Sequence, residues 1–120
     1  MPTDAMRWGR SLIRATLIGT VLQLVMVVMG HYDPRVAELF AVLGMFLSLV
    51  AGLLFGRWSL PLGKGGAALG GLVAGGLCAL LGIVESFSLG DVPAWVIAFG
   101  TASSAVTGAI GGWLGRISRR

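Results

Sequence analysis

The chain has little of the chemistry from which most catalytic and metal-binding sites are built. Its 120 residues include one cysteine and one histidine, and only 12% of them are charged. The lone Cys78 can form no disulfide within the chain, and the lone His31 gives no nucleophile a nearby base. The segment Gly63-Lys64-Gly65-Gly66 lacks the preceding strand and the spacing of a phosphate-binding loop. We therefore expect that the protein is not an enzyme and has no resident cofactor or metal.

Apolar residues take the place of charge and make up 56% of the chain. The charged fraction is about half that of typical soluble domains. A soluble protein of this length could not bury so much apolar surface, whereas a protein in a lipid bilayer need not. The composition therefore predicts an integral membrane protein with a single domain over residues 1–120. The net charge of +4 would suit nucleic acid, but its distribution along the chain favours a membrane, so no nucleic-acid partner is expected.

Four apolar stretches are long enough to cross the hydrocarbon core of a bilayer. They cover about residues 12–30, 36–56, 66–84 and 93–114. Each has about 19 to 22 residues, which as a helix would measure about 28–33 Å. Stretches this apolar must satisfy their backbone hydrogen bonds internally, so we expect helices. The short connections between them predict two antiparallel hairpins, and hence an all-α, four-helix transmembrane bundle.

The basic residues alternate with the apolar stretches. Eight of the nine Lys and Arg residues lie before or at the start of the first stretch, between the second and the third, or after the fourth. Because Lys and Arg of short loops stay on the cytoplasmic side, we expect both termini in the cytoplasm and a location in the inner membrane. Lipid headgroups are the expected partners of the basic residues near the chain ends, which are Arg7, Arg10, Arg14, Arg116, Arg119 and Arg120.

Glycine is abundant, with 20 residues, and most of it lies within the apolar stretches. Small residues recur every four positions in the second, third and fourth stretches, and residues four apart share a helix face. Such rows let another helix backbone approach closely. Helix packing is therefore expected at Gly44, Ser48, Gly52, Gly56, Gly70, Gly71, Gly75, Gly100, Gly108 and Gly112. The sequence does not decide whether these rows pack within one chain or between chains.

Few polar side chains fall within the apolar stretches. Gln23 lies near the middle of the first one, where a polar residue is costly and often functional. It either forms a hydrogen bond between helices, for which Ser48, Thr101 and Ser104 are candidates, or lines a path for a solute. The same alternatives apply to the hydroxyls of the fourth stretch, including Thr107, which can also bond to their own helix. We favour packing for all of them.

Ionisable side chains gather at the expected outer side. They are His31, Asp33, Glu38, Glu85 and Asp91. Carboxylates with one imidazole can bind a cation, but no ligand spacing is recognisable among them, so solvated side chains are the favoured interpretation.

Three functions follow from these observations. The lack of catalytic chemistry and the abundance of small-residue faces favour a small accessory, assembly or structural subunit of a larger inner-membrane complex, with other membrane proteins or copies of itself as partners. The alternative is a small homo-oligomeric channel or transporter for a small solute or ion. In it, Gln23, Thr101, Ser104 and Thr107 would line the route and Glu85 would lie at its mouth. A holin-like pore former is the third hypothesis, supported by the basic C-terminal end.

Overall fold

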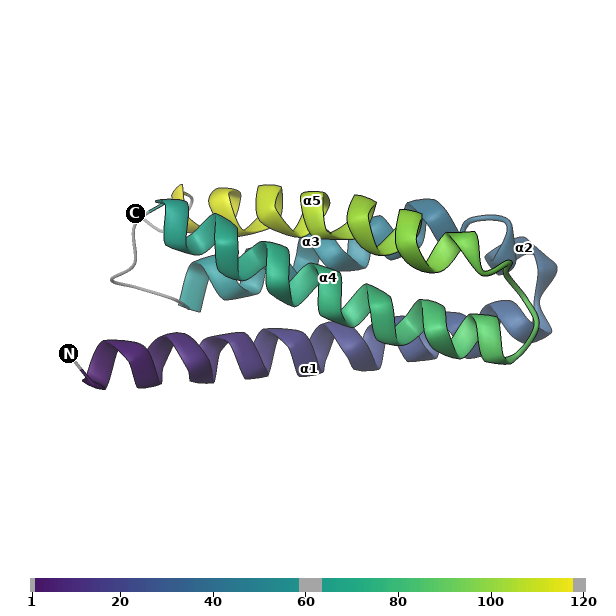
Figure 1. Ribbon diagram of the computed structural model, residues 1–120, viewed down its shortest axis with the longest axis horizontal. Coiled ribbons are helices and arrows are strands. Elements are labelled where there is room, and N and C mark those ends of the chain that lie inside the picture. The colour runs from purple at the N-terminus through teal and green to yellow at the C-terminus, as the bar shows by residue number, and fades with distance from the viewer. Residues whose placement is uncertain (1, 59–63, 118–120) are drawn as a thin grey trace.

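The fold of the described residues is entirely helical (Figure 1). The computed structural model describes residues 2–58 and 64–117, with side chains from Trp8 to Trp58 and from Gly66 to Ile117. The helices are α1 (Pro2–Tyr32), α2 (Pro34–Ala37), α3 (Phe40–Trp58), α4 (Lys64–Ser88) and α5 (Trp95–Ile117). In these ranges no residue forms a strand. The all-α fold class predicted from the sequence is therefore confirmed.

Four of the five helices in the described ranges are long and apolar enough to cross a membrane. The apolar segments are Trp8–Tyr32, Phe40–Trp58, Gly66–Ser88 and Trp95–Ile117, which contain 19 to 25 residues each. About 20 residues of helix are needed to span the hydrocarbon core. The number of such helices agrees with the four apolar stretches of the sequence, and α2 is too short to be a fifth.

Helix ends differ from the predicted ranges by four residues or more at three places. The largest difference is at α1, which begins at Pro2 rather than near residue 12. The second long helix begins at Phe40 rather than near residue 36, because the chain first forms the one-turn helix α2. Asp33 caps α2 by accepting a hydrogen bond from the backbone N–H of Arg35 at 3.0 Å, and Pro34 occupies its first turn. The third helix continues to Ser88, beyond the predicted residue 84, because helical hydrogen bonding does not stop where apolarity does.

A glycine cap ends α4 and directs the chain towards α5. Gly90 has a φ of +80°, a conformation that glycine adopts without strain. The backbone N–H of Asp91 donates to the carbonyl of Ser86 at 3.0 Å, and that of Gly90 donates to Phe87 at 3.0 Å. This pair of bonds is the Schellman arrangement of a helix C-terminus. It fixes the position of Asp91 beside the end of α4.

The long helices lie side by side, and each runs opposite to the one before it (Figure 1). Both α1 and α5 contact α3 and α4, and the molecule measures 46 by 24 by 21 Å. The start of α1 and the end of α5 lie at one end of the bundle, which we call the terminal end. The opposite end carries α2 and the α4–α5 loop, with Asp33, Glu38 and Asp91, and we call it the acidic end.

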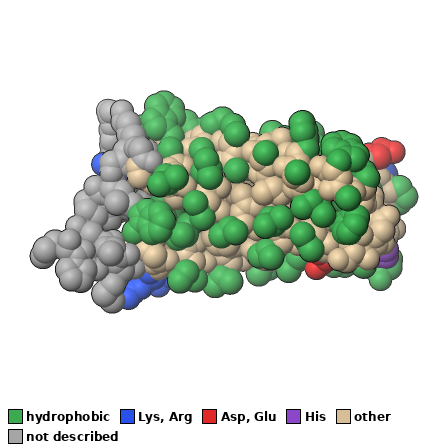
Figure 2. All heavy atoms as spheres, viewed as in Figure 1, with side chains coloured by type: hydrophobic (Ala, Val, Ile, Leu, Met, Phe, Trp, Pro, Cys, Tyr) green, Lys and Arg blue, Asp and Glu red, His purple; other side chains and the backbone are tan. Residues whose placement is uncertain are grey.

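Large apolar side chains point outward along the length of the bundle, as the face in Figure 2 shows. Val42 and Phe99 are each 67% exposed, and Ile13 is 61% exposed. The buried residues are mostly small, and the largest fully buried side chains are those of Phe55, Cys78 and Ser48. Large apolar residues outside and small ones inside are the reverse of a soluble protein, and this pattern suits helices that pack closely in lipid.

Glycine contacts bring the backbones of three helices together in the terminal half. A Cβ atom at Gly52 would overlap the carbonyl oxygen of Gly108, and one at Gly56 would lie 2.9 Å from the carbonyl carbon of Gly112. On the other side of α5, a Cβ at Gly75 would lie 2.8 Å from the Cα of Gly108. The glycine rows of α3 and α4 therefore both pack on α5.

The small-residue rows do not all make backbone contacts. A Cβ at Gly44 would meet only the Gln23 Oε1 atom at 3.6 Å and the Met26 Cε atom at 3.9 Å, and one at Gly100 would meet the end of the Ile83 side chain. Both glycines lie nearer the acidic end than Gly52 and Gly108 do. The backbone contacts thus belong to the terminal half of the bundle, and in the acidic half the same rows face side chains.

Candidate functional site

Gln23 joins three helices near the middle of the bundle. Its side chain is 2% exposed, and its Nε2 atom donates to the carbonyl of Gly44 at 3.0 Å and to Ser48 Oγ at 3.3 Å. Ser48 Oγ in turn donates to the carbonyl of Gly75 at 3.1 Å. These bonds connect α1 with α3 and α3 with α4. Of the three partners expected for Gln23, the structure brings Ser48 to it.

A cavity of about 380 Å³ lies between the four long helices, from Gln23 towards the acidic end. Gln23 of α1 and Ser104 of α5, both buried, line its deep part. Glu38 and Asp91 line it at the acidic end. Its volume falls within the range of about 300–1,000 Å³ that is common for small-molecule sites.

Small residues leave room for the cavity. Gly44 of α3, Gly82 of α4 and Gly100 of α5 all line it, as does Ala79. A Cβ atom at Gly82 would lie 3.0 Å from the Cβ of Gln23, so this glycine lets α1 and α4 approach each other. The cavity therefore lies in the half of the bundle where α3 and α5 lack the backbone contacts made by Gly52 and Gly108.

Aromatic side chains form part of the cavity wall. Phe40, Trp95 and Phe99 line it, and the rings of Trp95 and Phe99 make an edge-on contact with centroids 6.0 Å apart. Trp95 is 66% exposed and Phe99 is 67% exposed. Because these exposed residues belong to the wall, the cavity communicates with the surface beside α5.

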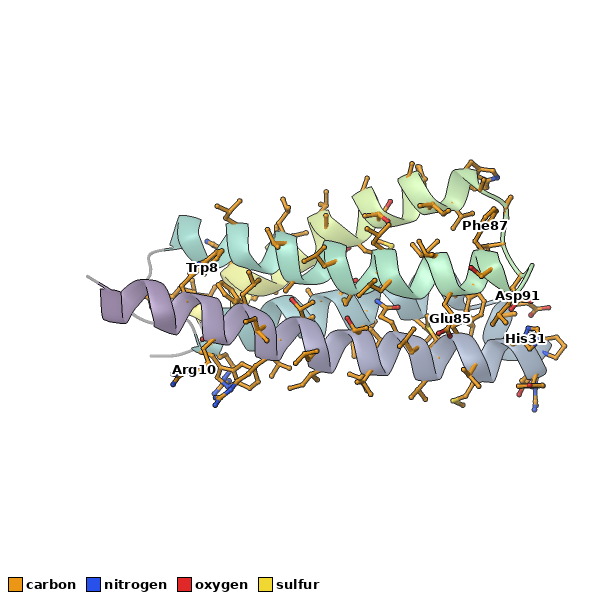
Figure 3. All side chains as sticks on the ribbon, turned by 60° about the horizontal axis from the view of Figure 1, so that its bottom comes forward. Trp8, Arg10, His31, Glu85, Phe87 and Asp91 are labelled. Carbon is orange, nitrogen blue, oxygen red and sulfur yellow. The ribbon has the colours of Figure 1, made fainter. Side chains whose placement is uncertain are left out.

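The predicted ionisable cluster is brought together only in part. His31 Nδ1 and Asp91 Oδ2 are 2.9 Å apart and link the end of α1 to the α4–α5 loop (Figure 3). Asp33 caps α2 and lies 3.4 Å from the Arg35 Nε atom. Glu38 lines the cavity with Asp91, whereas Glu85 does not. In the part of the chain that the structure describes, no three His, Cys, Asp or Glu residues are placed to hold a metal ion.

The predicted polar path is also divided. Ser104 lines the cavity with Gln23, whereas Thr101 and Thr107 do not. Thr107 Oγ1 donates to the carbonyl of Ser103 at 2.9 Å, within its own helix. The hydroxyl of Thr101 is buried and has no hydrogen-bond partner among the described residues. Of the three α5 residues expected to line a solute route, Thr101, Ser104 and Thr107, only Ser104 therefore lines the cavity.

Ser86 is a cavity residue that the sequence analysis missed. It is 3% exposed, lines the cavity, and its Oγ atom has no hydrogen-bond partner among the described residues. The predicted third helix ended at residue 84, which left Ser86 in a loop. The signal that would have found it is its position four residues after Gly82, on the same helix face.

The basic residues expected at lipid headgroups lie near the terminal end where they are described. Arg10 and Arg14 are exposed on α1, and Arg10 points away from the bundle in Figure 3. Arg116 lies in the last turn of α5 and is partly buried. The side chain of Arg7 and the whole of Arg119 and Arg120 lie outside the described part of the chain.

Comparison of the chain with protein-family models, curated proteins and solved structures finds no match.

Proposed function

We propose that the chain is a multi-pass protein of the inner membrane, folded as two antiparallel hairpins with both termini in the cytoplasm. The support is the four long apolar helices and the apolar residues exposed along them. The charges add to it, because arginines at the terminal end, such as Arg10 and Arg14, contrast with the carboxylates of Asp33, Glu38 and Asp91 at the other end. Basic residues on the cytoplasmic side then place the acidic end outside.

We propose that this bundle binds a small, largely apolar solute, as a small transporter or channel component would. The observation that carries the proposal is the cavity of about 380 Å³ that reaches from Gln23 to the acidic end. Pockets of this size with mostly apolar walls and a few polar groups are typical of small-molecule sites. The polar groups at its deep part, Gln23 and Ser104, are two of the residues that the transport hypothesis named.

The accessory-subunit hypothesis depended on small-residue faces in excess of what one bundle needs. Among the glycines whose surroundings the structure describes, only Gly9 and Gly90 have open space where a Cβ would be. The other glycines whose surroundings are described meet helices or side chains of the same chain. The hypothesis stays a prediction, as does the holin-like pore, and the mass of the intact assembly from native membranes in mild detergent tests both.

A cavity-filling variant tests the binding function. The protein in lipid nanodiscs is titrated with the neutral fluorescent probe N-phenyl-1-naphthylamine, and the signal of empty nanodiscs is subtracted. Gly44→Leu places a side chain at the cavity wall, where a Cβ meets only ordinary contacts. Gly9→Leu is the matched control, because nothing lies within 4 Å of a Cβ there. We expect saturable binding by the wild type and the control and loss of binding in Gly44→Leu. Equal binding by all three proteins, or none by the wild type, would refute the proposal.

A further inference from the structure

The polar groups of the cavity are distributed unevenly along its length. Glu38, Asp91 and Ser86 line the cavity at the acidic end. The backbone bond from Asp91 to Ser86 keeps these two residues together at the end of α4. Towards the middle of the bundle the wall carries no charge: it is formed by apolar residues such as Met26, Val27 and Ile83, together with the neutral side chains of Gln23 and Ser104.

The charge in the cavity wall has one sign. Among the described residues that line it, two are acidic and none is Lys or Arg. Arg35, the basic residue of the first loop at this end, lies beside Asp33 instead. His31 contacts Asp91 from outside the wall and does not line the cavity. An anion would therefore meet unfavourable charge at the acidic end, whereas a cation would meet two carboxylates.

The buried Ser86 hydroxyl is a second observation that points to a ligand. It is 3% exposed, and its Oγ atom is one of five buried side-chain atoms without a hydrogen-bond partner among the described residues. Of these five it is the one whose residue lines the cavity, and an unpaired buried polar group calls for an explanation. A serine side chain has three staggered rotamers, so its Oγ atom can turn towards a bound molecule. A hydroxyl oxygen and carboxylate oxygens all accept hydrogen bonds. The ligand group that satisfies them together is a donor with several N–H bonds.

The aromatic wall favours the same ligand. Phe40, Trp95 and Phe99 line the cavity. The face of an aromatic ring attracts a cation. An ammonium group would therefore find carboxylates and a hydroxyl at the acidic end and aromatic rings beside them. A hydrocarbon or aromatic body attached to it would occupy the apolar part of the cavity.

We propose that the cavity between Gln23 and the acidic end binds an amphipathic primary amine, with its ammonium group at Glu38, Asp91 and Ser86 and its apolar body towards Gln23. This assignment rests on the proposed binding function and specifies its ligand class. Lipid acyl chains and neutral or anionic apolar molecules fill the same volume but lack the group that these three side chains would hold.

Three ligands with the same phenylalkyl body and different polar groups separate the effect of ligand charge from that of ligand shape. 4-Phenylbutylamine, 4-phenylbutanol and 4-phenylbutyrate displace N-phenyl-1-naphthylamine from the wild type in nanodiscs of uncharged lipid, and the displacement constants are compared. The amine should bind about tenfold more tightly than the alcohol, since each exposed ion pair contributes up to about 1 kcal/mol, or about fivefold. The butyrate should bind more weakly than both.

Single substitutions test whether Glu38 and Ser86 hold the ammonium group. Glu38→Gln should weaken amine binding about two- to fivefold without changing alcohol binding, because one ion pair is removed. Asp33→Asn is the control, because it removes a carboxylate from the same end that does not line the cavity, and asparagine caps a helix as well as aspartate does. Ser86→Ala should weaken the amine more than the alcohol.

Each outcome has one meaning. Equal binding of amine and alcohol, or an equal loss in Asp33→Asn and Glu38→Gln, overturns the amine assignment and leaves the binding function standing. Failure of all three ligands to displace a probe that does bind also overturns the assignment, and a phospholipid retained in native mass spectra then identifies the occupant. Absence of saturable probe binding in the wild type contradicts the binding function itself.

Discussion

Replacing Gly52 by alanine tests the close contact between α3 and α5. A Cβ atom at this position would overlap the carbonyl oxygen of Gly108 and lie 2.8 Å from its carbonyl carbon and 3.0 Å from its Cα. All three atoms belong to the backbone of a helix, so no side chain can turn aside and the two helices must separate. Overpacking of this kind typically costs about 1–3 kcal/mol. Alanine gains about 0.5–1 kcal/mol over glycine inside a helix.

The difference between the two effects gives the expected result. We expect Gly52→Ala to lower the free energy of unfolding by about 1 kcal/mol, because a steric cost of about 2 kcal/mol, the middle of its range, exceeds the gain in helix propensity. The assay is reversible unfolding in detergent micelles, followed by the helical circular dichroism signal.

Two controls make this prediction specific. Gly44→Ala lies in the same row of α3 but meets only ordinary contacts at 3.6 Å and beyond, and Gly9→Ala has nothing within 4 Å. Neither should lose stability, and Gly9→Ala should gain about 0.5–1 kcal/mol from helix propensity. If Gly52→Ala were as stable as Gly44→Ala, the backbone contact at Gly108 would not exist and the account of the packing would be wrong.

Three further predictions concern the cap, the buried amide and the topology. Gly90→Ala should lower the free energy of unfolding by about 1–2 kcal/mol in the same assay, since Gly90 has a φ of +80°; an unchanged value would mean that this conformation is not required. Gln23→Leu should lower the free energy of unfolding by about 1 kcal/mol through loss of the hydrogen bonds to α3. A loss of binding free energy larger than this loss of unfolding free energy would show that Gln23 contacts the ligand directly. A cysteine at position 35 or 91, in a Cys78→Ala background, should react with a membrane-impermeant maleimide added outside intact cells; reaction from the cytoplasmic side alone would reverse the proposed topology.

The helices were largely predictable because each apolar stretch carries its own signal. The length and apolarity of 93–114 predict a helix independently of the rest of the chain. The observed helix α5 covers Trp95–Ile117. The ends were less predictable, because they depend on local capping. Hydropathy rises from residue 36 onward, yet the cap at Asp33 and the turn of α2 delay the long helix until Phe40.

The glycine rows indicated which faces can pack but not what they meet. Gly44 and Gly52 have the same spacing and helix face, yet only Gly52 meets a backbone. Two glycines outside the predicted set, Gly111 and Gly115, pack on the backbone of α3 near Leu49 and Leu53. What a small residue contacts depends on how close the neighbouring helix lies at that level. The sequence pattern does not give the distance between the two helices.

Individual residues of the candidate site were predictable from the sequence, but the cavity that they line was not. Gln23 and Ser104 were recognised because polar groups in apolar stretches are conspicuous. The cavity could not be, since it arises where α3 and α5 lack backbone contact beyond Gly52 and Gly108. Ser86 lies beyond the apolar stretch 66–84, so hydropathy alone does not assign it to the helix.

Photoaffinity labelling tests the central claim, that a small amphipathic molecule binds between the helices in the acidic half of the bundle. The protein in nanodiscs is mixed with a phenylalkylamine that carries a diazirine on its apolar end, and the mixture is irradiated. The labelled residues are identified by mass spectrometry. We predict saturable labelling of cavity residues such as Met26 and Met45, competed by 4-phenylbutylamine and lost in Gly44→Leu. Labelling that is not saturable and falls on outward residues such as Leu17 and Val21 would contradict the account.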